Sequence, residues 1–124
     1  MGRGHPECPQ RLDAIEDRLL ASGVSDALER LDVPLATLDH LRLAHSDEHV
    51  EYLQALDQRL TADAPAGGPA YAQIDPDTAL CPLSMLAARR AAGAAIAATN
   101  AVMAGEVDNA FCAVRPPGHH ATRD

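Results

Sequence analysis

Two adjacent histidines near the end of the sequence, His119 and His120, are the side chains best suited to proton-transfer chemistry. Histidine is the side chain best placed to exchange protons near neutral pH. Because the two imidazoles are neighbours, their protonation belongs to the pair. They follow Pro116, Pro117 and Gly118, where the prolines stiffen the backbone and the glycine permits a conformation barred to other residues. The segment therefore predicts a stiff turn that presents two imidazoles, either to a substrate or simply to solvent.

A second pair of histidines, His45 and His49, lies in a segment that satisfies the H-x-x-E-H pattern of one class of zinc protease. That chemistry needs both histidines on one face of a continuous helix. Ser46 is a strong N-cap residue, and a helix that begins after it leaves His45 outside. Local hydrogen bonding at the start of a helix is therefore the preferred interpretation of this pair.

The three cysteines, Cys8, Cys81 and Cys112, are widely spaced and form no CxxC pair. Free thiols in a reducing cytoplasm are the default for such a pattern. Residues 1–11 are polar and rich in Gly and Pro, unlike a signal peptide. The longest apolar stretch, residues 91–98, is too short to span a bilayer. We therefore expect a cytoplasmic protein that does not interact with membranes.

The composition suits part of a larger body better than a complete small protein. The chain has 124 residues and is 47% apolar, but it has only two Tyr, one Phe and no Trp. Aromatic rings bury the most area per residue, so we expect a thin core. The formal net charge of −8 and the absence of a basic stripe argue against nucleic-acid binding. An acidic surface attracts cationic substrates, although it also simply aids solubility.

Apolar periodicity and cap residues predict the elements that must position the histidines. The predicted helices run from Pro9 to a stop at Gly23, from Ser25 until Pro34, over about residues 47–61, and over residues 83–104 before Gly105. We expect a short extended segment at residues 35–38, a turn capped by Asp39 through Leu43, and a loop from residue 61 to residue 78.

Residues 109–115 are the best strand candidate. Phe111 to Val114 form an unbroken apolar run, which is typical of a strand buried on both faces of a parallel sheet. Helices that precede a buried strand indicate an α/β protein in which residues 83–104 pack on the sheet. In such sheets ligands lie beyond the carboxyl ends of the strands, where His119 and His120 stand.

Four blocks of the sequence together resemble the histone deacetylase and acetylpolyamine amidohydrolase family, in its class II-type and bacterial forms. They are GHPECPQRL at residues 4–12, AHSDEHV at 44–50, DPDT at 75–78 and RPPGHHA at 115–121. The blocks occur in the family's order and are spread over nearly the whole length of the chain. The resemblance implies a partial arginase-deacetylase-type α/β fold, with residues 1–124 as the N-terminal portion of one catalytic domain.

The resemblance also implies zinc-dependent hydrolysis of N-acetyl amides, with acetyl-lysine or an acetylated polyamine as substrate. His120 would act as general base and then as general acid, and His119 as its electrostatic partner. The family's zinc ligands are two Asp and one His on later loops, and none of them can be matched in this chain. We therefore expect no metal ligands here, and zinc only as a cofactor of the complete domain.

The remaining roles that the resemblance implies concern substrate and product. Asp77, or failing that Asp75, would hold the substrate at the rim of the site, to which Pro117 and Gly118 also contribute. Arg11 would line an internal cavity behind the metal. The alternative function is a truncated, non-catalytic remnant that folds or oligomerises without activity. We expect the isolated chain to be inactive, and either to self-associate as a homo-oligomer or to need its remainder for stability.

Overall fold

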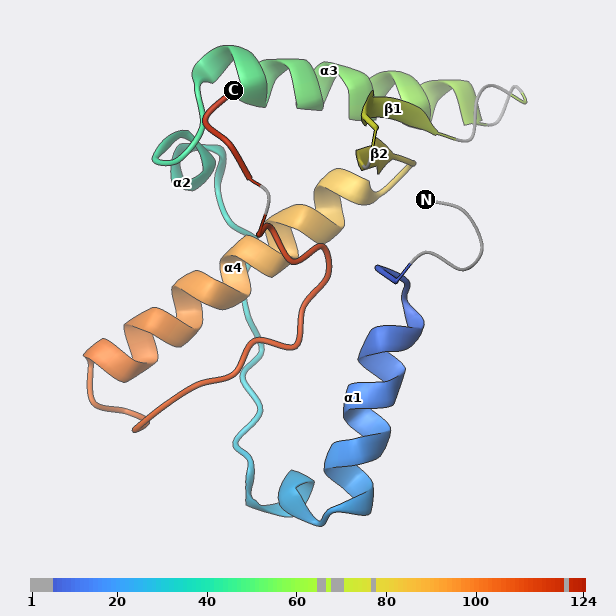
Figure 1. Cartoon of the computed structure of the whole chain (residues 1–124). Coiled ribbons are helices and arrows are strands. Elements are labelled where there is room, and N and C mark those ends of the chain that lie inside the picture. Colours follow the sequence, from blue (N-terminus) through green and yellow to red (C-terminus); the bar gives the residue numbers. More distant parts are fainter. Residues whose placement is uncertain (1–5, 65–66, 68–70, 77, 120) are drawn as a thin grey trace.

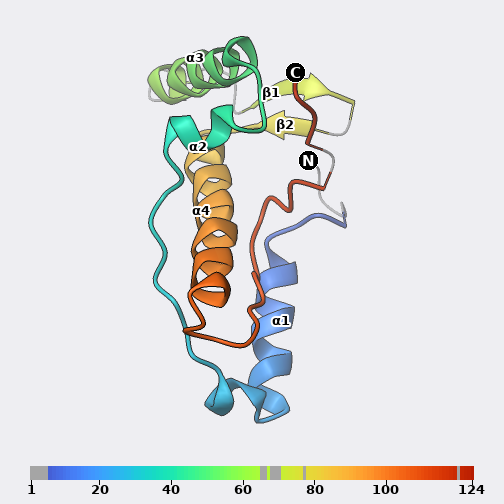
Figure 2. The same ribbon diagram turned by 90° about the vertical axis from the view of Figure 1, so that its left-hand side faces the viewer.

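The computed structural model describes residues 6–64, 67, 71–76, 78–119 and 121–124. In chain order its elements are α1 (Gln10–Ala21), the 3-10 turn η1 (Val24–Ala27), α2 (Leu38–Arg42), α3 (Asp47–Asp63), β1 (Ala72–Asp75), β2 (Thr78–Leu80) and α4 (Ser84–Met103). Helix α3 lies across one end of the molecule, α4 runs away from it, and α1 lies to the side (Figure 1). After α4 the chain returns between α4 and α1 toward α3, as Figures 1 and 2 both show.

The long helices begin and end close to where the sequence predicts. Helix α1 is followed by Gly23, whose φ of 72° is left-handed. Ser46 caps α3, its side chain accepting a hydrogen bond from the His49 backbone N–H. Helix α4 ends in a Schellman motif, because the Glu106 N–H donates to the Ala101 carbonyl and Gly105 has a φ of 70°. These predictions are confirmed.

Two shorter predictions are wrong. The helix predicted from Ser25 until Pro34 is only the single turn η1, and the backbone is already extended at Leu28. The loop predicted up to residue 78 contains a hairpin, in which β1 and β2 pair antiparallel with Ala72 opposite Leu80. The hairpin forms because it can bury alternate side chains against the helices, a tertiary effect that local composition does not reveal.

The predicted strand at residues 109–115 does not form. The segment is irregular, and Phe111 is 79% exposed. An extended segment becomes a strand only when a neighbouring strand satisfies its backbone groups. Within the described part of the chain the sheet contains β1 and β2 alone, and it is antiparallel. The parallel sheet is thus not formed by these residues, and α4 packs on other partners.

The core is small and lies where α3, β2 and α4 meet. Its buried members are Leu56, Leu60, Leu80 and Met85. Many large apolar side chains remain exposed, which fits the thin core that the composition predicts. None of the described helices is long and apolar enough to cross a membrane.

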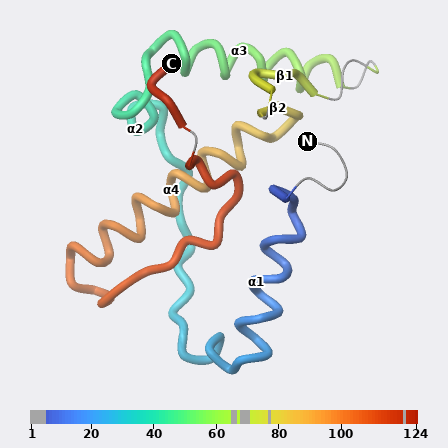
Figure 3. The backbone as a smooth tube through the Cα atoms, in the orientation of Figure 1, coloured from blue at the N-terminus to red at the C-terminus, as the bar shows by residue number. Residues whose placement is uncertain are grey.

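A seam of hydrogen bonds joins α4 to the extended segment before α2, whose course is clear in the tube view (Figure 3). The Ala36 N–H donates to the Arg89 carbonyl at 3.0 Å, and Arg89 Nε donates to the Ala36 carbonyl at 2.8 Å. Arg90 Nη1 donates to the Val33 carbonyl at 3.0 Å. Ala36 is 1% exposed, so α4 uses this segment as its packing partner at its middle.

Candidate functional site

The loop after Arg115 has the turn that the sequence predicts. Gly118 has a φ of 75°, a conformation that glycine adopts without strain. The Ala121 N–H donates to the Gly118 carbonyl at 3.0 Å and closes the turn. Pro117, Gly118 and His119 are exposed. His120 lies outside the described residues, so its place and role remain predictions.

Glu7 links the two ends of the sequence. Arg115 Nη2 donates to the Glu7 backbone carbonyl at 2.9 Å. Arg11 Nη1 lies 2.9 Å from Glu7 Oε2, and the exposed fractions of these two side chains are 38% and 22%. The GHPE block and the RPPGHH block, more than a hundred residues apart in sequence, are therefore in direct contact.

The contact between Arg115 and Glu7 is not predicted from the sequence, although both residues lie inside the blocks that resemble the family. Arginine offers five N–H donors in a planar fork, so an arginine next to a proline pair was a candidate anchor. Its partner could not be inferred from sequence, because the acceptor is a backbone carbonyl of another segment.

Asp75 stands at the end of β1 and is exposed. Its carbonyl accepts a hydrogen bond from Gln73 Nε2 at 2.6 Å, and it lies opposite Thr78 across the hairpin turn. Asp77 lies outside the described residues. Figures 1 and 2 place the hairpin and the last residues of the chain at the same end of the molecule, next to α3. A rim formed jointly by the hairpin and the histidine loop is compatible with this arrangement.

The His45 and His49 rings stack with their centroids 5.2 Å apart and an interplanar angle of 27°. Because α3 begins at Asp47, His45 precedes the helix, as predicted. The Ser46 backbone N–H donates to the Arg123 carbonyl at 2.8 Å, so the end of the chain rests on this helix start. The pair is thus part of a local structural contact rather than of a continuous H-x-x-E-H helix.

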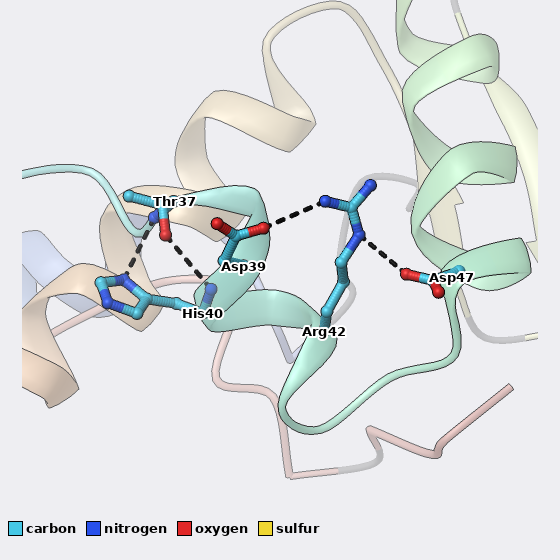
Figure 4. A network of polar contacts seen from close by, with 5 residues as sticks. All are labelled: Thr37, Asp39, His40, Arg42 and Asp47. Carbon is cyan, nitrogen blue, oxygen red and sulfur yellow. Dashed lines mark hydrogen bonds and ion pairs between the residues drawn. The ribbon is translucent and has the colours of Figure 1, made fainter.

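A polar network fixes the junction of α2 and α3 (Figure 4). Arg42 bridges two carboxylates, with Nη1 3.1 Å from Asp39 Oδ1 and Nε 2.8 Å from Asp47 Oδ1. Thr37 and His40 form a reciprocal cap at the start of α2, where the sequence predicted Asp39 as the cap. Asp39 instead lies in the first turn and pairs with Arg42. Exposed ion pairs contribute about 0–1 kcal/mol each, so the network orients the helices more than it stabilises them.

The described residues contain no group of three or more His, Cys, Asp or Glu side chains that could hold a metal ion. A catalytic zinc site needs three protein ligands and one open position. This part of the chain therefore does not fit a zinc site of its own. The cysteines are free thiols, with Cys8 and Cys112 half-buried and Cys81 exposed.

Several known proteins are similar to this chain in sequence, and a solved structure is similar to it in fold. The histone deacetylase domain model matches residues 5–124. A histone deacetylase-like amidohydrolase of Pseudomonas aeruginosa is 37% identical over 121 residues, which are 98% of this chain and 29% of that protein. The polyamine deacetylase HDAC10 of Rattus norvegicus is 38% identical over 94% of this chain and 19% of its own length. The crystal structure of the HDA15 HD domain superposes with a TM-score of 0.84 at 32% identity, covering 99% of this chain and 32% of that one.

Proposed function

The chain belongs to the histone deacetylase domain family and has part of that α/β fold, and from this premise we propose that it is the N-terminal portion of one deacetylase catalytic domain. The family resemblance and the fold class predicted from sequence are both confirmed. The chain spans less than a third of the length of each relative named above. The activity of the whole protein is therefore proposed.

The proposed reaction is hydrolysis of an N-acetyl amide. A water oxygen bonds to the acetyl carbon, the C–N bond breaks, and acetate and a free amine leave. His120 takes the proton from the attacking water and then delivers a proton to the leaving amine. His119 supports this exchange electrostatically. A positioned general base contributes about 10²–10⁴ to the rate.

Zinc is proposed as a cofactor of the complete domain. Its binding residues are assigned to loops beyond this chain, since the described residues offer no suitable cluster.

The proposed substrates are acetyl-lysine in proteins or acetylated polyamines. One relative is named a polyamine deacetylase and another a histone deacetylase-like amidohydrolase. We therefore propose both acetylated polyamines and acetyl-lysine as substrate classes. The net charge of −8 favours the approach of a cationic substrate. Asp77 or Asp75 would hold it at the rim beside Pro117 and Gly118, and Arg11 would line the inner cavity. A cytoplasmic location and the lack of nucleic-acid and membrane partners remain predictions from composition.

The observation that carries the proposal is the contact between the two most specific sequence blocks. Arg115, which opens the RPPGHH block, is hydrogen-bonded to Glu7 of the GHPE block. The contact brings the segment before α1 next to the histidine loop, as the proposed catalytic domain requires. A non-catalytic remnant with the same fold would keep this contact, so the activity of the full-length protein separates the two functions.

The test is His120→Ala in the full-length protein, with deacetylation and bound zinc measured on the same preparation. We expect the rate to fall by about 10²–10⁴, because proton transfer is lost. Zinc content should stay unchanged, because a general base does not ligate the metal.

His40→Ala is the matched control. His40 belongs to the α2 cap, where its Nδ1 accepts a hydrogen bond from the Thr37 N–H, and its loss should leave the rate of the folded protein near wild type. Loss of stoichiometric zinc in His120→Ala, or full activity of that variant, would contradict the assigned role.

A further inference from the structure

Arg115 is placed to hold the histidine loop in position. We propose that Arg115 is a positioning residue, whose guanidinium fixes residues 116–119 against the segment before α1 through the Glu7 carbonyl. The inference rests on the proposed function, because the loop that Arg115 holds carries His119, one of the two histidines to which that function assigns a role.

The loop needs a side-chain anchor because its own backbone cannot supply one at the start. Pro116 and Pro117 lack N–H groups, so two consecutive residues have no backbone donor. Their fixed φ angles make the chain stiff between Arg115 and Gly118. A displacement of Arg115 is therefore transmitted along the loop instead of being absorbed within it.

The acceptor is itself held in place. The Glu7 carboxylate is ion-paired with Arg11 in the first turn of α1. The Cys8 N–H donates to the Pro6 carbonyl at 3.1 Å, and the Arg11 N–H donates to the Cys8 carbonyl at 3.1 Å. The Glu7 carbonyl is thus presented by a segment tied to a helix, which makes it a firm point of attachment.

The guanidinium is held by burial as well as by its hydrogen bond. Arg115 is half-buried, and its Nε is inaccessible to solvent with no partner among the residues that the structure describes. A hydrogen bond from an ionised donor such as Arg115 Nη2 is shorter and stronger than one from a neutral donor. Lysine would keep the charge but offers a single flexible ammonium instead of a planar fork. The site therefore favours arginine over lysine.

The test uses the full-length protein with Arg115→Gln, Arg115→Lys and the matched control Arg90→Gln. Glutamine loses the charge and the reach to Glu7. Arg90 also donates from its guanidinium to a distant carbonyl, that of Val33, but it does so on α4, away from the loop. Two readouts are needed: kcat and KM for an acetyl-lysine peptide and an acetylpolyamine, and hydrogen exchange of the Ala121 amide, which closes the Gly118 turn.

We expect Arg115→Gln to lower kcat by about 10- to 100-fold with KM changed less than about threefold, since small misplacements of reacting groups have effects of this size. Ala121 should exchange about tenfold faster or more, Arg115→Lys should lie between, and Arg90→Gln should match wild type in both readouts. Equal losses in Arg115→Gln and Arg90→Gln, or unchanged exchange in Arg115→Gln, would overturn the inference.

Two further outcomes are also decisive. If Arg115→Gln yields no folded protein, the Arg115→Lys variant decides. A kcat reduced about 3- to 10-fold together with faster exchange of the Ala121 amide supports the inference. Wild-type values of kcat and of Ala121 exchange overturn it. If the wild-type protein hydrolyses neither substrate, the proposed function fails. The exchange of Ala121 then still decides whether Arg115 holds the loop.

Discussion

Two hydroxyl groups determine where α2 and α3 begin. Thr37 Oγ1 accepts the His40 N–H at 3.2 Å, and Ser46 Oγ accepts the His49 N–H at 3.2 Å. Each hydroxyl satisfies one of the backbone donors that a helix leaves unpaired at its first turn. The start of α3 matters beyond the helix itself, because the Ser46 backbone N–H also donates to the carbonyl of Arg123 at the end of the chain.

Ser46→Ala should lower the free energy of unfolding of the full-length protein by about 1 kcal/mol, the usual contribution of a serine N-cap. Urea unfolding measures this value. Ser22→Ala is the matched control, because Ser22 Oγ donates to the Leu19 carbonyl at an exposed helix end, and it should change stability by less than about 0.5 kcal/mol. A larger loss in Ser22→Ala than in Ser46→Ala would mean that the cap does not govern α3.

The sequence predicts one of these caps and misses the other. Ser46 stands directly before two acids and a periodic apolar run, so its role follows from local rules. At α2 both Thr37 and Asp39 can cap a helix, and local rules do not choose between them. Thr37 is the cap because its own backbone N–H also donates to His40 Nδ1, whereas Asp39 is ion-paired with Arg42.

At the scale of elements, close packing explains why small residues occur in the middle of α4. Gly93 is buried in α4, and a Cβ at this position would overlap the Pro34 carbonyl oxygen and come within 3.0 Å of the Ala36 nitrogen. The abundant alanines of this helix indicate close approach by a neighbour. They do not indicate that the neighbour is the extended segment around Pro34 and Ala36, far earlier in the chain, because that choice depends on long-range packing.

Gly93→Ala should destabilise the full-length protein by about 1–3 kcal/mol, because overpacking against backbone cannot be relieved by a rotamer change. Helix propensity alone predicts the opposite sign, a gain of about 1 kcal/mol. The sign of the change in urea unfolding therefore separates packing from propensity. Ala95→Gly, at an exposed position of the same helix, should cost only the propensity term of about 1 kcal/mol. A Gly93→Ala variant more stable than wild type would refute the close contact.

At the scale of the whole molecule, the segment after α4 pairs with no strand among the described residues. Residues 109–115 have the apolar run of a buried strand, yet Phe111 is exposed and no described strand lies alongside. The sequence pattern predicts burial on both faces of this segment, but the exposure of Phe111 contradicts that prediction for the described residues. The pattern does not show which strands would lie beside this segment, and without neighbouring strands the segment forms no sheet.

An isolated polypeptide of residues 1–124 should self-associate at micromolar concentration. A segment with strand-forming sequence and no neighbouring strand among the described residues is a template for pairing with another chain. Phe111→Asp should shift the sedimentation profile toward monomer, while Leu43→Asp, at an equally exposed position of the α2–α3 turn, should shift it less. Equal effects of both substitutions would mean that association is not centred on residues 109–115.

The same isolated polypeptide should neither bind catalytic zinc tightly nor hydrolyse acetyl-lysine or acetylpolyamine. Three ligands must converge on a catalytic zinc ion, and the described residues bring no such set together. His119 and His120 are sequence neighbours, so both rings cannot readily reach one ion, and the role proposed for them is proton transfer. Elemental analysis of the purified polypeptide measures bound zinc, and both substrates are assayed with and without a chelator. Stoichiometric zinc with chelator-sensitive turnover would contradict this expectation and direct attention to the stacked His45 and His49 rings, which lie 5.2 Å apart.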